Sequence, residues 1–157
     1  MHERSKLKEA RDFLGRMDDE RGNLPAFTRE LSGFMTAARS VLQYACKEAK
    51  QKPGGQHWYD QAVAKDPLFG FFKDQRDTNI HVEPVNPVRK WTTEEASLLN
   101  ISDDDDDSLI PYSHTRTVEH YRFKDRPGED VCDLSRRYYD LLDALVEDGV
   151  GKGWITG

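Results

Sequence analysis

Arg76 and His81 are the two residues whose types and spacing offer the clearest chemistry. They lie five positions apart in the segment 68–84, which reads LFGFFKDQRDTNIHVEP. An arginine presents a permanently charged, forked set of donors to an anion. A histidine has an ordinary pKa of about 6.5, so it can accept or donate a proton near neutral pH. The pair therefore offers anion binding combined with proton transfer.

The same segment is predicted to form a helix that ends at the histidine. Asp66 suits the N-cap and Pro67 suits the first helical position, where the missing N–H costs little. Pro84 and Pro87 stop the helix, because the residue before a proline is pushed out of the α region. The helix is therefore expected to run from Asp66 to about His81.

Four-residue steps along this helix place Leu68, Phe72, Arg76 and Ile80 on one ridge. A guanidinium buried without a partner is costly, so Arg76 is expected to meet a carboxylate, a phosphate or a subunit interface. In an ideal helix, Arg76 and His81 lie about 140° apart around the axis and roughly 7.5 Å apart along it. Their side chains do not stack, but both can border one cleft at the helix end.

Other segments repeat apolar residues at helical spacing and must position this pair. The strongest starts at Asn23, a suitable N-cap, and ends before Pro53. A helix of ~25 residues spans roughly 37 Å, enough for the axis of a small bundle. Further helices are predicted at about 5–20, 56–65 and 129–148.

The helical pattern breaks between the fourth and the last helix. Val88–Thr93 and Thr115–Phe123 have the composition of strands, and Thr93–Asn100 is predicted as one or two helical turns. Five consecutive aspartates, Asp103–Asp107, follow and are expected to be a solvated loop. The sequence thus predicts an antiparallel ribbon with an acidic loop at its tip, inserted before the last helix.

The run Arg76-Asp77-Thr-Asn79-Ile-His81 resembles the Arg-polar-x-x-x-His motif of HEPN domains (higher eukaryotes and prokaryotes nucleotide-binding). In that family, two long antiparallel helices precede the motif and another helix follows. The resemblance covers about 5–83 and 129–148, and leaves 84–128 as an insertion. It implies one domain over 1–157 with a mainly α fold: a four- to five-helix HEPN-like bundle with a small antiparallel β-ribbon before the last helix.

The resemblance also implies an activity, that of a metal-independent endoribonuclease acting as a homodimer. Two copies of the motif would form one cleft, in which a ribose 2′-OH attacks the adjacent phosphate and leaves a 2′,3′-cyclic phosphate. His81 would move the proton, Arg76 would stabilise the transition state, and Asp77 would orient the imidazole. Asn79 and Lys73 are the candidates for binding RNA. No cofactor is implied, and a toxin or defence effector with a nucleotidyltransferase-type antitoxin is the expected setting.

Three alternatives remain open. The arginine can be an ordinary surface residue paired with Asp74 or Asp77, next to a histidine favoured by the helix dipole. The bundle can be a non-catalytic HEPN domain that binds a nucleotide or a protein partner. The chain can also be a metal-binding bundle that uses His57, His114 and His120, although these histidines are widely spaced.

Composition limits the classes of partner. The net charge is −6, with 14 Lys and Arg against 12 Asp and Glu in 1–82 and 9 against 17 in 83–157. An acidic balance argues against non-specific affinity for nucleic acid but permits a local cationic site in the first half. No apolar run is long enough to span a bilayer, and no leader segment is apparent, so neither a membrane partner nor secretion is expected.

Cys46 and Cys132 are too few for a disulfide framework or a zinc site, and are expected to be small buried thiols in a reducing cytoplasm. The aromatic pairs Phe71-Phe72 and Tyr138-Tyr139 resemble platforms for base stacking. At helical spacing among leucines, they are expected to lie in the core or in a dimer interface.

Overall fold

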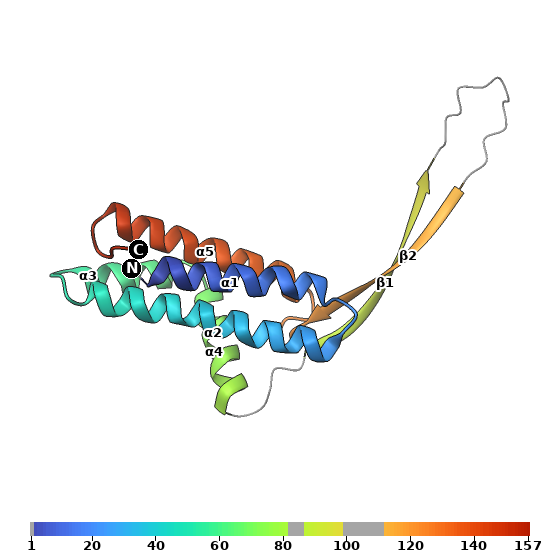
Figure 1. The fold of residues 1–157 in the computed structure, drawn as a ribbon, viewed down its shortest axis with the longest axis horizontal. Helices are drawn as coiled ribbons and strands as arrows, with labels where there is room; N and C mark the ends of the chain where they lie inside the picture. Colours follow the sequence, from blue (N-terminus) through green and yellow to red (C-terminus); the bar gives the residue numbers. More distant parts are fainter. Residues whose placement is uncertain (1, 82–86, 99–111) are drawn as a thin grey trace, which may run out of the picture.

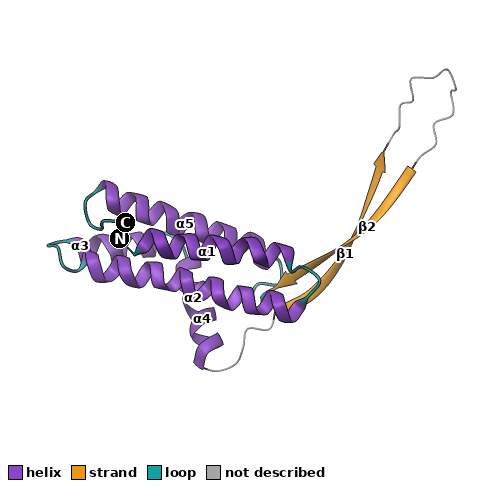
Figure 2. Cartoon of the chain, viewed as in Figure 1, coloured by secondary structure: helices purple, strands orange, loops and turns teal. Residues whose placement is uncertain are grey.

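The computed structural model describes residues 2–81, 87–98 and 112–157. This part of the chain forms a mainly helical bundle with a two-stranded antiparallel sheet before the last helix, as the sequence predicts (Figure 1, Figure 2). The elements are α1 (Glu3–Asp19), α2 (Leu24–Ala49), α3 (Gly55–Ala64), α4 (Leu68–His81), β1 (Val88–Leu98), β2 (Tyr112–Arg122) and α5 (Val131–Gly151).

Three long helices, α1, α2 and α5, lie side by side with their axes nearly aligned, whereas α4 runs across the bundle and the ribbon projects from one end (Figure 1). α1 runs opposite to α2 and α5 in this view. Within the described part of the chain, none of the helices combines the length and the apolar character that crossing a bilayer requires.

An aromatic cluster holds α4 to the other helices. The Phe72 ring stacks on the Tyr138 ring of α5, with centroids 4.3 Å apart and planes 3° apart. Phe34 of α2 meets the Phe72 ring edge-on at 6.0 Å. Phe71 and Tyr139 also pack against this core. Phe72 and Tyr138 are thus buried in the core, whereas Phe71 and Tyr139 are partly buried at its edge, in line with the prediction of a core or interface location.

Side chains cap three helices as local sequence rules predict. The Asn23 carboxamide oxygen accepts from the Ala26 N–H at 3.4 Å, the Asp66 carboxylate from the Leu68 N–H at 2.8 Å, and the Asp130 carboxylate from the Cys132 N–H at 2.9 Å. Each cap satisfies a backbone donor that the first helical turn leaves unpaired.

The last helix continues past its predicted end at Asp148 to Gly151. Gly149 does not terminate it. A Cβ at position 149 would lie 2.6 Å from Cη2 of Trp58 and 2.9 Å from Cγ1 of Ile155. The glycine is therefore needed for close packing inside the helix, and tertiary contacts outweigh its low helix propensity.

The ribbon is longer than predicted. β1 pairs with β2 in antiparallel register from Val88 opposite Arg122 to Leu98 opposite Tyr112. The prediction of helical turns at Thr93–Asn100 is wrong for 93–98, because the cross-strand ladder supplies the backbone hydrogen bonds of this polar stretch. Residues 99–100 and the five aspartates at 103–107 lie outside the described residues.

The bundle end of β2 is held by two buried aromatic side chains. Tyr121 packs on Phe27 of α2, with ring centroids 4.1 Å apart. Phe123, just after β2, meets Phe71 of α4 at 5.2 Å. Tyr121, Phe123 and Glu119 are two residues apart along the strand and therefore share one face, on which both rings are buried. The ribbon is thus fixed at its base and extends away from the bundle (Figure 2).

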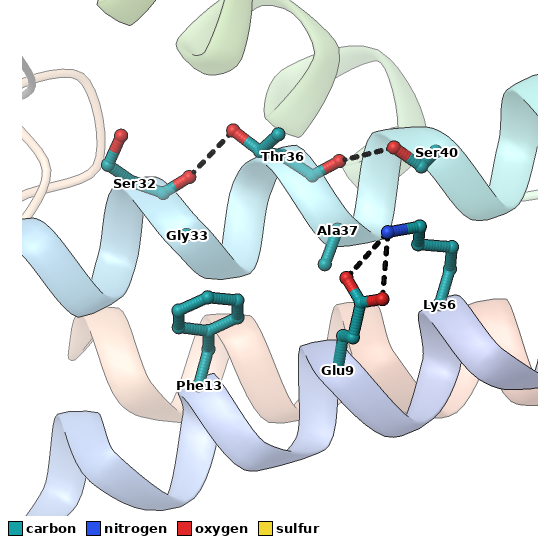
Figure 3. Close-up of a pocket in the computed structure, with 8 residues that line it drawn as sticks. All are labelled: Lys6, Glu9, Phe13, Ser32, Gly33, Thr36, Ala37 and Ser40. Carbon is teal, nitrogen blue, oxygen red and sulfur yellow. Dashed lines mark hydrogen bonds and ion pairs between the residues drawn. The ribbon is translucent and has the colours of Figure 1, made fainter.

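Gly33 allows α1 and α2 to approach closely. The effect of Gly33→Ala on the free energy of unfolding should therefore have opposite signs with and without the Phe13 ring. A Cβ at position 33 would overlap the Phe13 ring, which lies over the glycine (Figure 3). Gly33→Ala should therefore lower the free energy of unfolding by about 1 kcal/mol in the wild-type protein, because overpacking outweighs the gain in helix propensity.

In a Phe13→Ala background, the obstruction is absent. The same Gly33→Ala change should then raise the free energy of unfolding by up to ~1 kcal/mol, the propensity difference alone. Urea denaturation of the four proteins measures both values. A stabilising effect in the wild-type protein would contradict the proposed close approach.

Candidate functional site

The predicted Arg76–His81 motif lies on the last two turns of α4, which runs without a break from Leu68 to His81. Leu68 and Phe72 are buried in the core, and Arg76, one turn further along the same ridge, has a side chain that is 23% exposed. The ridge therefore passes from the core to the surface at the arginine, which keeps part of its guanidinium accessible to a ligand.

Arg76 is partly paired. Its Nη1 lies 3.1 Å from Oδ1 of Asp77. Its Nε is buried and has no hydrogen-bond partner among the described residues. Of the two partners that the alternative reading gives Arg76, the structure shows Asp77. Asp74 pairs with Lys73 instead, with its Oδ1 3.7 Å from Nζ of the lysine.

Asp77 lies between two cations. Its Oδ1 bonds to Arg76, and its Oδ2 lies 3.2 Å from Nζ of Lys73. These hydrogen bonds, from Arg76 first and Lys73 second, lower the pKa of Asp77 below its usual value. Asp77 is therefore ionised at neutral pH. Its predicted role in orienting His81 stays a prediction, because the His81 side chain lies outside the described residues.

Asn79 connects the end of α4 to the long helix α2. Its Nδ2 donates to the Ser32 hydroxyl at 2.8 Å. This contact fixes the backbone position of the last turn of α4, which includes His81. Asn79 thus has a structural contact in addition to the RNA-binding role that the sequence suggests.

Charges on this face of α4 nearly balance. Lys73 and Arg76 face Asp74 and Asp77, which pair with them. α4 alone therefore provides little surplus positive charge for an anionic ligand. One further cation lies where the segment after β2 meets α4, because the Cζ atom of Arg126 is 4.8 Å from the Phe71 ring centroid.

A second polar group, which sequence reasoning missed, joins the ribbon to the bundle. We call it the ribbon-base cluster: Arg21, Glu119, His120, Tyr121 and Asp130. Arg21 donates from Nη2 and Nη1 to the two oxygens of Asp130 at 2.9 and 3.2 Å, and from Nη1 to the Glu119 carbonyl at 3.4 Å. Nδ1 of His120 lies 3.4 Å from Asp130, and the Tyr121 hydroxyl donates to Glu119 at 2.9 Å.

Asp130 is the centre of the ribbon-base cluster. Its side chain is 9% exposed, and burial by itself raises the pKa of this carboxyl. The hydrogen bonds and charge of Arg21 outweigh burial, so the pKa of Asp130 lies below its usual value. The acid that leads the last helix could be recognised as a cap from the sequence, but its arginine partner lies 109 residues away and gives no local signal.

The third alternative, a metal-binding bundle, gains no support from the described residues. Among the side chains that the structure describes, no group of three or more His, Cys, Asp or Glu residues is arranged to hold a metal ion. His57 is exposed on α3, and His120 belongs to the ribbon-base cluster. The His114 side chain lies outside what the structure describes.

A shallow groove of about 280 Å³ lies between α1 and α2, close to the α4 contact (Figure 3). Small residues of α2 form its floor. Lys6 and Glu9, both on α1, lie along its edge, where Nζ of the lysine donates to the two carboxylate oxygens at 2.7–2.8 Å. Ser32, which bonds to Asn79, is among its lining residues. The groove offers small hydroxyls but no free charge of its own.

The chain was compared with models of protein families, with curated proteins and with solved structures, and no match was found in any of the three comparisons.

Proposed function

We propose that this protein is a homodimeric, metal-independent endoribonuclease of the HEPN type, with Arg76 and His81 as its catalytic residues. The observation that carries the proposal is the state of Arg76. Its side chain leaves the apolar ridge of α4 partly exposed, on a helix that continues unbroken to His81. A charged donor held in this way suits the non-bridging oxygens of a phosphate.

The reaction that fits this pair is an internal transfer within RNA. The ribose 2′-OH attacks the adjacent phosphorus and loses its proton to an imidazole, and the bond to the 5′-oxygen of the next nucleotide breaks. A proton is returned to that 5′-oxygen. The products are a 2′,3′-cyclic phosphate and a 5′-hydroxyl. His81 serves as the proton carrier, and Arg76 stabilises the charge on the pentacoordinate transition state.

A second copy of the chain is part of the proposal. Because the charges of α4 nearly balance and the net charge is −6, one motif is a weak binding site for a polyanion. Two motifs facing one cleft would bring together two arginines, two lysines at position 73 and two histidines. One imidazole could then act as base and the other as acid.

The setting proposed for this activity is the cytoplasm, where free thiols stay reduced. Cys46 and Cys132 are both free, and Cys132 is buried. A toxin or defence effector restrained by a nucleotidyltransferase-type antitoxin is the role we propose.

Cleavage in the presence of EDTA tests the proposed function. Purified protein should cut single-stranded RNA with the chelator present and leave 2′,3′-cyclic phosphate ends. Arg76→Ala should abolish the cut, whereas Arg29→Ala, which alters an exposed arginine of α2, should not. Light scattering should give a mass near twice 18.1 kDa. Equal residual activity in the wild-type and Arg76→Ala proteins, or a stable monomer, would contradict the proposal.

The second candidate, a non-catalytic bundle that binds a nucleotide or a protein partner, is favoured by one observation. Asp77 and Asp74 together balance the charges of Arg76 and Lys73 within the same helix. If the dimer forms and binds RNA or nucleotide but does not cut, this candidate replaces the first.

A further inference from the structure

The edge of β1 that faces away from β2 has no partner strand within the described residues, because their sheet contains these two strands only. In an antiparallel pair, every second residue directs its N–H and C=O groups away from the neighbouring strand. Such a free edge is a template for pairing with another strand. A two-stranded ribbon that extends away from its bundle, as Figure 2 shows, is also only marginally stable in water, and further strands stabilise it.

The charges of β1 change sign along the strand. Arg89 and Lys90 lie near its start, whereas Glu94 and Glu95 lie in its second half. An antiparallel partner with the same sequence places its acidic half beside the basic half of the first copy. A parallel partner in the same register would place like charges directly opposite each other, which is destabilising. The pattern therefore favours antiparallel pairing of β1 with a second copy of itself.

One two-fold register matches both basic residues with both acidic residues. In this register, Thr92 lies opposite Thr92 of the second copy. Lys90 then lies opposite Glu94 of the second copy, and Arg89 lies opposite Glu95. Moving the self-paired position to either neighbouring residue breaks both matches. Opposite charges at directly paired positions stabilise an antiparallel sheet.

The ion pair of Arg89 within its own ribbon is compatible with this register. Arg89 pairs with Glu119 of β2, on one side of β1. The second copy would bring Glu95 to the other side. A guanidinium has five N–H donors, enough for two carboxylates, so Arg89 would lie between two acids.

Lys90 is matched more simply. It is exposed, and the residue opposite it in β2 is His120 rather than an acid. Glu94 lies opposite Arg116 in its own ribbon. The row across the two ribbons would therefore read His120, Lys90, Glu94, Arg116, with the single acid between the lysine and the arginine.

The free edge of β2 lacks this pattern. Its two arginines, Arg116 and Arg122, lie at even positions, and its one acid, Glu119, lies at an odd position. Even and odd positions are on opposite faces of a strand, and two-fold pairing places even residues opposite even residues. No two-fold register of β2 therefore matches an arginine with the acid, and β1 is the edge that fits a second copy.

The register also keeps the two bundles apart. Val88, at the base of the ribbon, would lie opposite Ala96 of the second copy. The two bases would then be about 26 Å apart along the strand direction, at ~3.3 Å per residue. Because each bundle lies beyond the base of its own ribbon (Figure 1), the bundles would extend in opposite directions.

We propose that the β1 strands of two copies pair antiparallel about Thr92 and form a four-stranded sheet in the order β2, β1, β1, β2. Only residues 88–96 of each copy take part, against the roughly 20–30 residues a side of a standard interface, so the contact should form as the protein concentration rises. It is separate from the cleft at α4 and does not rest on the proposed function. A protein that makes both contacts would link its dimers through the ribbons.

Disulfide trapping of Thr92→Cys tests the register. Directly paired Cα atoms in an antiparallel sheet are about 4.5–5.5 Å apart, a separation that a disulfide spans. Thr92→Cys should therefore form a covalent dimer under mild oxidation, faster at higher protein concentration. Ser97→Cys is the matched control, because two copies of position 97 would be about 33 Å apart and should not cross-link. Both variants keep Cys46 and Cys132, so the background from the native thiols is the same.

Charge reversal in the Thr92→Cys protein tests the matched charges. Lys90→Glu alone, or Glu94→Lys alone, places like charges opposite each other at two positions, so cross-linking should slow by about 3- to 30-fold. Mixing the two variants restores opposite charges between unlike chains only. With a short tag on one variant, the mixture should give mainly the mixed dimer, at a rate close to that of the parent protein.

The outcomes separate the ribbon contact from the proposed function. The ribbon contact is overturned if Thr92→Cys does not cross-link, if Ser97→Cys cross-links equally well, or if the mixture cross-links no faster than either reversed variant. Cleavage of RNA in EDTA by the wild-type protein is the independent measurement. Cleavage without the cross-link leaves the endoribonuclease proposal standing, and the cross-link without cleavage leaves the ribbon contact standing.

Discussion

His81→Ala should slow RNA cleavage by about 10²- to 10⁴-fold, the range that loss of a general acid or base produces. The residue ends α4, after the core contacts of Leu68 and Phe72 and the Asn79–Ser32 hydrogen bond. The fold should therefore persist, and the far-ultraviolet circular dichroism spectrum should not change. Initial rates on a defined single-stranded oligonucleotide in EDTA measure the effect.

His57→Ala is the matched control, because His57 is an exposed histidine on α3, outside the proposed site. Its rate should equal that of the wild-type protein. A wild-type rate in His81→Ala would remove the imidazole from the mechanism, even if Arg76→Ala were inactive. In that case, Arg76 would be required for RNA binding alone.

Asp130→Ala should lower the free energy of unfolding by about 2–4 kcal/mol. The change removes the N-cap of α5, for which about 1 kcal/mol is typical. It also leaves Arg21 with one carboxylate fewer in a partly buried position, where the two oxygens lie 2.9 and 3.2 Å from the guanidinium. The estimate stays below that for a fully buried pair, because Arg21 is 25% exposed and water screens its charge.

Asp133→Ala is the control within the same helix. Asp133 lies in the first turn of α5 and pairs with Arg136, but its side chain is 69% exposed. Its removal should change stability by no more than about 0.5 kcal/mol. Urea denaturation compares the two variants. Equal stability of Asp130→Ala and Asp133→Ala would show that the ribbon-base cluster contributes no more than a surface pair.

The stability of Asp130→Ala should also depend less on acid pH. The pKa of Asp130 is lowered in the folded protein, so its contribution is fully present above the unfolded value of about 3.9. It is lost as the pH falls through the lower folded value. The difference in stability between wild-type and Asp130→Ala proteins should therefore shrink in acid.

Local patterns in the sequence predicted the elements whose causes are local. Asn23 and Asp66 cap helices because their own side chains reach the backbone a few residues on. The strand at Thr115–Phe123 could likewise be predicted from its composition, and the two-residue spacing of Tyr121 and Phe123 accounts for their common face. The position of Arg76 on α4 could be predicted in the same way, from four-residue spacing after Leu68 and Phe72.

Features that depend on distant partners could not be predicted. The strand at 93–98 has a polar composition, and its pairing with 112–117 decides its structure. A glycine at position 149 suggests from the sequence alone that the last helix ends there. Its actual role, close packing against Trp58, depends on a residue of another helix. The contacts of Arg21 with Asp130 connect residues 109 apart, so neither spacing nor composition reveals them.

The ribbon is fixed only at its base, so a small tilt there produces a large displacement at its distal end. Strands of 11 residues extend roughly 36 Å at ~3.3 Å per residue, so a tilt of about 5° at the anchor would carry the distal end, at Leu98 and Tyr112, through ~3 Å. Two contacts lie at this base: the Tyr121 ring is buried on Phe27, and Asp130 is bonded to Arg21. A substitution there would thus be amplified into a displacement far from the mutated atom.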